Sequence, residues 1–324
     1  MTAPRVSVVI CAYAAERWDA LEAAVAATRE QRGRAAEVVV VVDHNRDLYE
    51  RARRRWPDLA VVENAEAPGL SGARNSGVAA ARGDILAFLD DDAVPAPDWL
   101  DRLLAGYREP AVVGVGGAIE PAWACRRPRW FPSEFDWVVG CTYRGLPEHA
   151  TPVRNLIGAN MSYRREAFAV LGGFRLGYGC DETEFCIRLA QRLPGRVLLY
   201  QPAALIRHQV PAARATWRYF CRRCYFEGGS KAVVARLVGA QDGLASERRY
   251  TARTLPRGVA RGLADAARGD PAGLARAGAI AAGLALTAAG YLRARLGVAA
   301  AARARGWAGQ LPARGARPRQ EGAP

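Results

Sequence analysis

Three consecutive carboxylates, Asp90, Asp91 and Asp92, directly follow the apolar run 85–89. Adjacent acids repel one another, and burying them without a partner costs free energy. A divalent cation would remove both penalties, because Mg²⁺ binds one or two carboxylates together with substrate phosphates. The alternative interpretation is an acidic turn that caps a helix opening at 97–99. The triplet by itself does not separate the two interpretations.

The elements around the triplet predict where it lies. Apolar runs of strand length alternate with helical stretches, which predicts an α/β fold with an open, mostly parallel sheet and flanking helices. Ligands of such sheets bind at the carboxyl ends of strands. Tyr13, Asp43 and the triplet all follow predicted strands, which favours a binding site. The strands are expected at 6–10, 37–42, 61–62 and 85–89, and the helices at 16–31, 47–55 and 73–81.

Two common ligands of this kind of sheet are excluded by the sequence. Dinucleotide binding requires a glycine-rich turn after the first strand, and residues 11–16 contain no glycine. A P-loop requires Gly-Lys followed by Ser or Thr, and Lys231 stands in no such context. The remaining candidate is a metal-held nucleotide diphosphate, in which the ion neutralises the charge of a leaving diphosphate.

The second part of the chain contains an aromatic, proline-rich segment at 121–155 that is too apolar for a disordered linker and is expected to cover a cleft. Arg222, Arg223 and Lys231, on the long helix expected at 213–238, are expected either to face a phosphate of the donor or acceptor or to lie on a solvated surface. Further strands are expected at 112–119 and 197–200, with helices at 165–171, 182–193 and 213–238.

The positive charge is concentrated at the C-terminal end. Of the net charge of +14, +11 falls in residues 248–324. Residues 277–292 are uncharged, which is short of a comfortable membrane span, and Arg293 follows directly. We expect a helix lying on an anionic membrane surface, or alternatively one that packs on the rest of the chain or forms a homo-oligomer contact. Residues 303–324 are expected to be disordered.

Cysteine usage and the N-terminus predict the compartment. The seven cysteines are an odd number, and Met1 leads into a strand-like segment without a charged and apolar leader. Neither a disulfide framework nor a secretion signal is expected. The prediction is a cytoplasmic protein, peripheral at the inner face of the membrane if the tail binds lipid.

Six motifs of the chain resemble, in order, those of family 2 glycosyltransferases with the GT-A fold. The resemblance is to non-processive transferases of bacterial cell-envelope or lipid-linked glycans, since the Gln-x-x-Arg-Trp motif of processive synthases is lacking. We expect a GT-A domain over 1–210, a long helix packed on it at 211–247 and a basic helical extension at 248–324. The motifs lie at 6–13, 38–43, 72–77, 88–92, 158–164 and 181–188.

The resemblance implies roles for single residues. Tyr13 and Asp43 would lie along the nucleoside, with Asp43 accepting hydrogen bonds from the base, and Arg74 would hold the nucleotide near its phosphates. Asp90 and Asp92 fit the family's DxD motif. Asp92 would bind Mn²⁺ or Mg²⁺, and Asp90 would contact the ribose or reach the ion through water.

A third metal ligand has one candidate in the sequence. His208 follows a strand where GT-A enzymes can place such a ligand, and the alternative is a hydrogen-bonded core histidine. Asp91 is expected to turn away from the ion.

The resemblance also implies a catalytic base, the carboxylate that takes the proton of the acceptor hydroxyl. The family usually has Glu-Asp at the head of a late helix, with the Asp as base, whereas this chain has Asp181-Glu182. Glu182 stands at the position of the family's catalytic Asp, whereas Asp181 has the same residue type as that base. Asp181 and Glu184 have the spacing of a capping box, which would commit Asp181 to backbone amides, so we favour Glu182.

Together these expectations describe a metal-dependent, inverting hexosyltransferase. It would move one sugar from a nucleotide-diphosphate donor, expected to be a UDP-sugar, to a hydroxyl of a glycan or lipid-linked acceptor. Trp137 and Asn160 are expected in the acceptor region, and no nucleic-acid partner is expected. The alternative is a non-catalytic nucleotide-sugar binding or membrane-surface scaffold protein. A sugar nucleotidyltransferase would need a glycine-rich, arginine-ending loop near the first strand, which is lacking.

Overall fold

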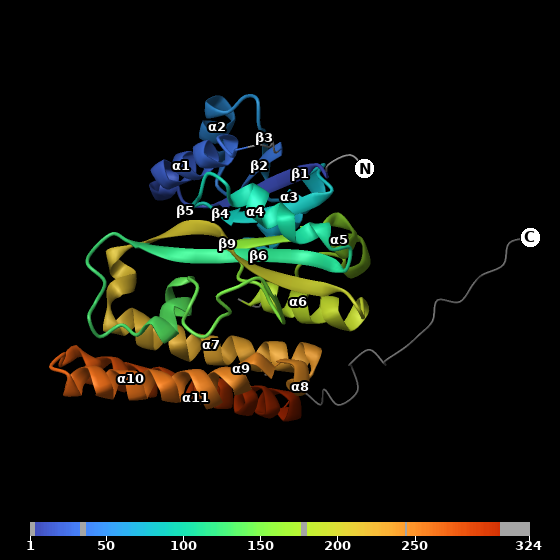
Figure 1. Cartoon of the computed structure of the whole chain (residues 1–324). Helices are drawn as coiled ribbons and strands as arrows, with labels where there is room; N and C mark the ends of the chain where they lie inside the picture. Colours follow the sequence, from blue (N-terminus) through green and yellow to red (C-terminus); the bar gives the residue numbers. More distant parts are fainter. Residues whose placement is uncertain (1–3, 33–36, 176–179, 244, 305–324) are drawn as a thin grey trace, which may run out of the picture.

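The computed structural model describes residues 4–32, 37–175, 180–243 and 245–304. Its centre is one mixed sheet with the strand order β3-β2-β1-β4-β8-β6-β9-β5, and β7 pairs with β9 (Figure 1). The predicted open sheet with flanking helices and a helical C-terminal extension is confirmed. The strands are β1 (Val6–Ala12), β2 (Glu37–Val42), β3 (Ala60–Glu63), β4 (Ile85–Asp90), β5 (Ala93–Pro95), β6 (Val112–Trp123), β7 (Thr151–Val153), β8 (Asn160–Arg164) and β9 (Val197–Val210).

Strand pairing brings the candidate residues to one edge of the sheet. β1 lies between β2 and β4 and is parallel to both, so that Cys11 is paired with Val41 on one side and with Asp90 on the other. The carboxyl ends of the three strands therefore meet, as the sequence predicts. The second half of the sheet is mixed, because β8 is antiparallel to β4 and β6, while β9 is parallel to β6.

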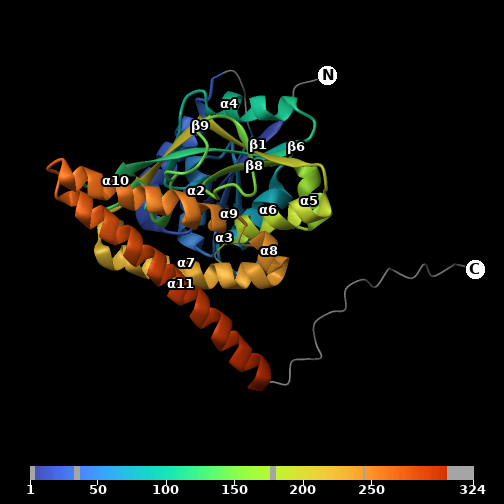
Figure 2. The ribbon, with the colours of Figure 1, turned by 60° about the horizontal axis from the view of Figure 1, so that its bottom comes forward.

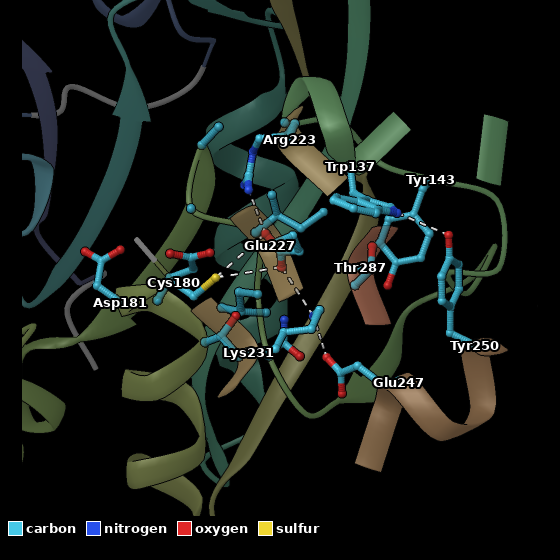
Figure 3. A pocket seen from close by; sticks show the side chains of 18 of the residues that line it. Trp137, Tyr143, Cys180, Asp181, Arg223, Glu227, Lys231, Glu247, Tyr250 and Thr287 are labelled. Atoms are coloured by element: carbon cyan, nitrogen blue, oxygen red, sulfur yellow. Dashed lines mark hydrogen bonds and ion pairs between the residues drawn. The ribbon is translucent and has the colours of Figure 1, made fainter. Parts of the chain in front are cut away.

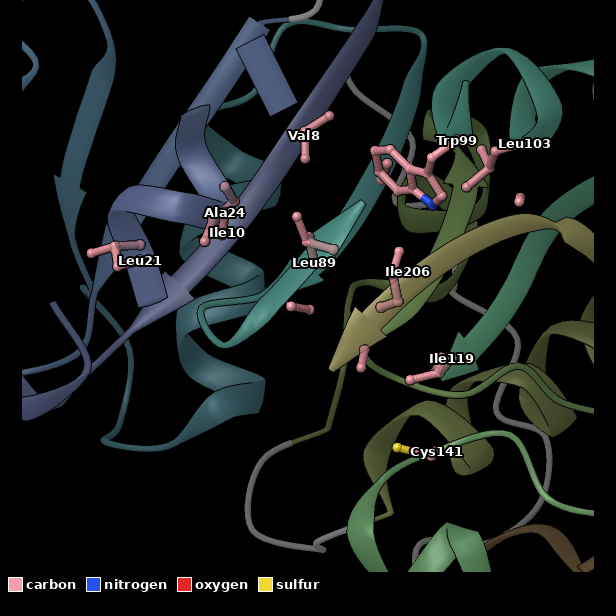
Figure 4. Close-up of a cluster of buried hydrophobic side chains, with 14 of the residues drawn as sticks. Val8, Ile10, Leu21, Ala24, Leu89, Trp99, Leu103, Ile119, Cys141 and Ile206 are labelled. Carbon is pink, nitrogen blue, oxygen red and sulfur yellow. The ribbon is translucent and has the colours of Figure 1, made fainter. Parts of the chain in front are cut away.

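The central strands are buried on both faces because helices cover both sides of the sheet. Side chains of a strand point alternately to opposite faces, and Val8 and Ile10 join one hydrophobic cluster whereas Val9 joins another. The first cluster includes Leu21 of α1 and Trp99 of α4 (Figure 4). This burial holds the three strand ends in fixed positions relative to one another.

The helices follow the predicted order. Gly239 ends α7 with a positive φ of 93°, which suits glycine, so the helix predicted at 213–238 corresponds to α7, and the short helices α8 and α9 follow it. The helices are α1 (Trp18–Arg29), α2 (Arg46–Arg55), α3 (Leu70–Ala80), α4 (Trp99–Ala105), α5 (Arg165–Leu171), α6 (Asp181–Arg192), α7 (Trp217–Val238), α8 (Ala240–Gly243), α9 (Ala245–Arg249), α10 (Leu255–Ala267) and α11 (Ala272–Ala304).

Several boundaries differ from the prediction. The helix predicted at 73–81 starts earlier, because α3 already begins at Leu70. The short strand predicted at 197–200 is the first part of the longer strand β9, which also contains His208. The disorder predicted for 303–324 falls almost entirely outside the described residues.

The C-terminal helices pack on the β6 and β9 side of the sheet (Figure 1). α11 crosses α7 at close range, and its far end extends beyond the rest of the protein (Figure 2). Glycines permit the crossing: a Cβ atom on Gly228 would collide with the Thr287 carbonyl oxygen, and one on Gly290 with the Tyr225 carbonyl oxygen. Backbones can approach this closely only where side chains are absent.

The crossing can be tested with two adjacent glycines of α7. Gly228→Ala should destabilise the protein by about 2 kcal/mol, because the methyl group overpacks the contact with α11. Gly229 has no atom near its Cβ position, so Gly229→Ala should stabilise by up to about 1 kcal/mol through helix propensity. Urea unfolding of both variants measures the difference. Equal effects would contradict the close crossing.

Candidate active site

The three consecutive aspartates at the end of β4 take different positions. Asp91 is buried, and its Oδ1 accepts a hydrogen bond from Arg17 Nη1 at 2.7 Å. Burial, together with the neighbouring Asp92 carboxylate, raises the pKa of Asp91 to about 6 in spite of the Arg17 charge. Arg17, which no sequence motif indicated, thus holds Asp91 and also lies 3.2 Å from Asp92 Oδ2.

Asp90, Asp92 and His208 form a compact group whose ligand atoms all lie within 4.8 Å of one another. Antiparallel pairing of β5 with β9 sets Ala93 opposite His208 and so brings the imidazole to the triplet. Asp92 Oδ1 is buried and has no hydrogen-bond partner among the described residues, although His208 Nε2 lies 3.1 Å away. Two carboxylates and an imidazole form a donor set that fits a divalent cation such as Mn²⁺.

Asp43 and Tyr13 lie at the same edge. The Asp43 carboxylate accepts hydrogen bonds from Asn64 Nδ2 at 2.6 Å and from the Gly69 amide at 2.8 Å. Burial alone would raise the pKa of Asp43, but these bonds and His44 outweigh it and lower the pKa. Asp43 is therefore ionised and tied to the loop before α3, while the Tyr13 side chain is 56% exposed.

Arg74 of α3 is buried rather than solvated. Its Nη1 donates to Asp181 Oδ2 at 3.2 Å, and its Nη2 donates to the Gly158 carbonyl oxygen at 3.1 Å and lies 3.8 Å from Asp90 Oδ1. The guanidinium therefore stands between the candidate metal group and the first turn of α6. It compensates the charge of carboxylates on both sides.

Asp181 and Glu182 open α6, but the predicted capping box does not form. The residue before the helix, Cys180, is its N-cap and makes no side-chain cap. Asp181 instead accepts hydrogen bonds from Ser71 Oγ at 2.9 Å and from Arg74. A long-range ion pair has replaced the local cap, because the buried Arg74 charge requires a partner.

The two neighbouring carboxylates have opposite pKa shifts. Burial would raise the pKa of Asp181, but Arg74 and hydrogen bonds, including that of Ser71, lower it overall. Burial and the adjacent Asp181 charge both raise the pKa of Glu182 well above its usual range. Glu182 is half-buried and lines the cavity described next. It is therefore the more basic of the two.

A cavity of about 760 Å³ extends from Asp90, Arg74 and the first turn of α6 to the C-terminal helices. Figure 3 shows Asp181 on one side, Trp137, Tyr143 and Tyr250 on the other, and a charged cluster between them. Trp137 Nε1 donates to the Tyr250 hydroxyl at 3.1 Å, which fixes the aromatic wall. The segment 121–155 thus does line a cavity, as its composition predicts.

Asn160, predicted in the acceptor region, does not line this cavity. Its side chain is fully buried and accepts a hydrogen bond from Trp99 Nε1 at 2.8 Å. It also donates to the carbonyl oxygens of Ala118 and Ala204 at 2.9 and 2.8 Å. Both amide hydrogens and the amide oxygen are engaged inside the core, where they join β8 to β6, β9 and α4, so the structure gives Asn160 a structural role instead of the predicted place in the acceptor region.

The charged cluster of the cavity is built around Lys231, the only lysine of the chain. Its Nζ lies 2.8 Å from Glu247 Oε1 and 3.3 Å from Glu227 Oε1. Arg223 also binds Glu227, at 2.8 Å, and Arg154 binds Glu247 at 3.0 Å. Arg223 and Lys231 are therefore paired with carboxylates and not free to meet a phosphate without rearrangement. Lys231 fastens α9 to α7, and Arg154, which follows β7, binds the same glutamate of α9.

This cluster predicts a pH-dependent stability. Burial would raise the pKa of Glu247, but Lys231 and Arg154 lower it from 4.5 to about 2. Its contribution to stability is complete above the unfolded pKa of 4.5 and disappears as the pH falls towards 2. Lys231→Met should cost about 2 kcal/mol at neutral pH, and the difference from wild type should shrink in acid. Arg236→Met, on the exposed side of α7, is the control in urea unfolding. A pH-independent cost would contradict the ionic origin.

Comparisons with known proteins point to one family. The glucosyl-dolichyl phosphate glucuronosyltransferase of Haloferax volcanii is 35% identical over 242 residues, which is 71% of this chain and 77% of that protein. The succinoglycan biosynthesis protein ExoM of Rhizobium meliloti is 30% identical over 200 residues, which is 59% of this chain and 62% of that protein.

A solved structure shares the fold. The mannosyltransferase PcManGT from Pyrobaculum calidifontis, in complex with GDP-Man and Mn²⁺, superposes with a TM-score of 0.57 at 22% identity. The match covers 89% of this chain and 88% of that chain. The GT-A fold implied by the sequence motifs is thereby confirmed.

The family model described as glycosyl transferase family 2 matches residues 7–172, about half of the chain. The matched stretch contains Asp43, Arg74 and the aspartate triplet, which the structure brings to one edge of the sheet. This chain therefore belongs to glycosyl transferase family 2.

Proposed function

We propose that this family 2 glycosyltransferase is a metal-dependent, inverting enzyme that moves one sugar from a UDP-sugar to a hydroxyl of a lipid-linked glycan. The observation that carries the proposal is the position of Arg74, which contacts the candidate metal group through Asp90 and the base candidates of α6 through Asp181. Cation-binding carboxylates on one side and a half-buried carboxylate on the other suit displacement of a diphosphate at a sugar carbon.

The donor side of the site consists of Asp90, Asp92 and His208. The superposed mannosyltransferase was captured with GDP-Man and Mn²⁺, which supports a nucleotide-diphosphate sugar and Mn²⁺ here, although Mg²⁺ suits the same oxygen ligands. When bound, such an ion neutralises the charge that develops on the leaving diphosphate. Of these three residues, Asp90 also lines the cavity described above.

We place the nucleoside along Tyr13 and Asp43. The exposed Tyr13 ring offers a face for stacking on the base. The Asp43 carboxylate is ionised and oriented by Asn64, so that its remaining lone pairs can accept hydrogen bonds from the nucleoside. Arg74, being buried and paired, acts on the diphosphate through its charge and its hold on Asp181 rather than as a solvated clamp.

The reaction is a single displacement. The acceptor hydroxyl oxygen forms a bond to the anomeric carbon while the bond from that carbon to the diphosphate oxygen breaks, and the diphosphate leaves with the electron pair. Glu182 removes the hydroxyl proton. Attack from the side opposite the leaving group inverts the configuration at the anomeric carbon.

Glu182 suits this role better than Asp181. A base needs a free lone pair and a pKa near the working pH, and the pKa of Glu182 is raised by burial and by Asp181. Asp181 is occupied by Ser71 and Arg74, and its pKa is lowered. We assign Asp181 to positioning: it fixes Arg74 and keeps Glu182 basic.

The acceptor proposal rests on the relative and on the cavity. The Haloferax volcanii relative is named for glucosyl-dolichyl phosphate, an isoprenoid-linked glycan. In this chain, Trp137, Tyr143 and Tyr250 form an aromatic wall on the side of the cavity away from Asp181 (Figure 3). Aromatic faces bind both sugar rings and hydrocarbon chains.

Substitution of the two α6 carboxylates tests the base. After a panel of nucleotide sugars with Mn²⁺ has identified the donor by thermal shift, transfer to an isoprenyl-phosphate glucoside is followed by mass spectrometry. Glu182→Gln should lower kcat about a thousandfold without loss of folding. Asp181→Asn should lower it about tenfold and also lower the melting temperature, because Arg74 loses its partner.

The pH profile supplies a second measurement. Because the pKa of Glu182 is raised, kcat/KM should fall on the acid side at a higher pH than an ordinary carboxylate would give. Wild-type rates in Glu182→Gln would rule out Glu182 as the base, and a lack of transfer by the wild type would instead support a non-catalytic nucleotide-sugar binding protein.

Mn²⁺ binding tests the metal group without reference to any sugar. Asp92→Asn should weaken Mn²⁺ affinity, measured by isothermal titration calorimetry, by at least about tenfold. Asp91→Asn is the matched control and should leave the affinity within about threefold, because its carboxylate faces Arg17. Equal losses in both variants would place the ion elsewhere.

A further inference from the structure

One wall of the cavity is made by α11, far from the family motifs in sequence. Thr287 lies beside the aromatic side chains Tyr143 and Tyr250 (Figure 3), and Leu284 and Leu292 also line the cavity. Leu284 is nevertheless 39% exposed and Leu292 57% exposed. The cavity therefore reaches the surface of the protein along α11, through an apolar mouth.

The outer side of α11 is apolar over a long stretch. Residues 272–297 are long and apolar enough to cross a membrane, with a mean hydropathy of 1.4, and only 28% of the scored window is buried. Leu296 is 71% exposed, one turn beyond Leu292. An uncovered apolar surface of this length is a binding surface.

Packing decides how this helix meets a membrane. Around Gly290, α11 lies against α7, and α7 carries Arg223, Glu227 and Lys231. If α11 crossed the bilayer, these charges would be drawn towards the hydrocarbon region, which costs several kcal/mol each. The packing therefore favours a helix that lies in the membrane surface with one apolar side down.

We propose that α11 lies in the surface of an anionic membrane and that the hydrocarbon chain of the acceptor enters the cavity from the bilayer past Leu284 and Leu292. This inference rests on the proposed transfer to a lipid-linked acceptor and deepens it. The chain would run along Thr287 and Tyr291 to the aromatic wall. The glycan would then lie towards Glu182, on the opposite side of the cavity.

The positive charge of the C-terminal region indicates that a bilayer, and not a second copy of this chain, covers the apolar side of α11. Residues 248–324 carry a net charge of +11, and the exposed residues Arg293 and Arg295 directly follow the uncharged part of α11, 277–292. Two copies meeting through α11 would bring these charges together. Anionic headgroups would instead be attracted to them, at about 1 kcal/mol for each arginine near the surface.

Vesicle binding tests the membrane contact. The full chain should float with vesicles of equal parts phosphatidylglycerol and phosphatidylcholine, and more weakly with phosphatidylcholine alone. Leu292→Glu combined with Leu296→Glu should reduce binding at least about tenfold. Val170→Glu is the matched control, because Val170 is a similarly exposed apolar residue on α5 (53%). Since all three residues are exposed, melting temperatures should stay close to wild type.

Photolabelling tests the route of the chain. Trypsin cleaves after Arg276 and after Arg293 and so releases the peptide 277–293. This peptide contains all the α11 residues that line the cavity. A benzophenone-bearing farnesyl phosphate should label this peptide, and excess farnesyl phosphate should compete. A benzophenone phosphate without the isoprenoid chain should not label it.

Three results would overturn the proposal. The first is unchanged vesicle binding by the double Leu→Glu variant, and the second is labelling confined to other peptides. The third is a wild-type dimer, seen by analytical ultracentrifugation, that the double variant converts to a monomer without any vesicle binding by either. None of these readouts needs turnover, so a failed transfer assay with intact labelling would overturn the proposed reaction alone.

Discussion

The buried guanidinium of Arg74 is the interaction on which the site depends. It lies at the meeting point of α3, β4, α6 and the loop before β8, and it holds one partner on three of them: Asp90, Asp181 and the Gly158 carbonyl. A buried cation without such partners would be strongly destabilising. The Arg74 charge compensates Asp90 of the candidate metal group and also Asp181 at the start of α6. One side chain therefore fixes the distance between the candidate metal group and the candidate base.

Local patterns explain why much of this arrangement could be predicted from the sequence. The apolar runs at 6–10, 37–42 and 85–89 are buried on both faces of a parallel sheet, and no other element type fits such runs between helices. Parallel neighbours end at a common edge, so the positions of Asp43 and the aspartate triplet follow from the strands alone. The sequence indicates His208 as a possible third metal ligand, but its approach to Asp92 depends on the pairing of β5 with β9.

The rest of the site depends on contacts between residues far apart in the chain, for which a sequence contains no local signal. Asp181 and Glu184 have capping-box spacing, yet Asp181 is bound by Arg74, more than a hundred residues earlier. Asn160 stands in a family motif, but its side chain forms hydrogen bonds with backbone carbonyls and with Trp99 inside the core. The pairing of Lys231 with Glu247 likewise requires a reversal of the chain after α7 that composition does not indicate.

The origin of the cavity walls has a consequence for how such enzymes diverge. The aspartates and Arg74 belong to the stretch matched by the family model, 7–172, whereas the wall facing them is completed by Tyr250, in the π-helical turn that follows α9, and by α11. Substitutions in the C-terminal helices can therefore reshape part of that wall without touching the residues to which we assign the nucleotide and the ion. Under the proposed function, acceptor choice could then change through the C-terminal helices while the donor side of the site stays the same.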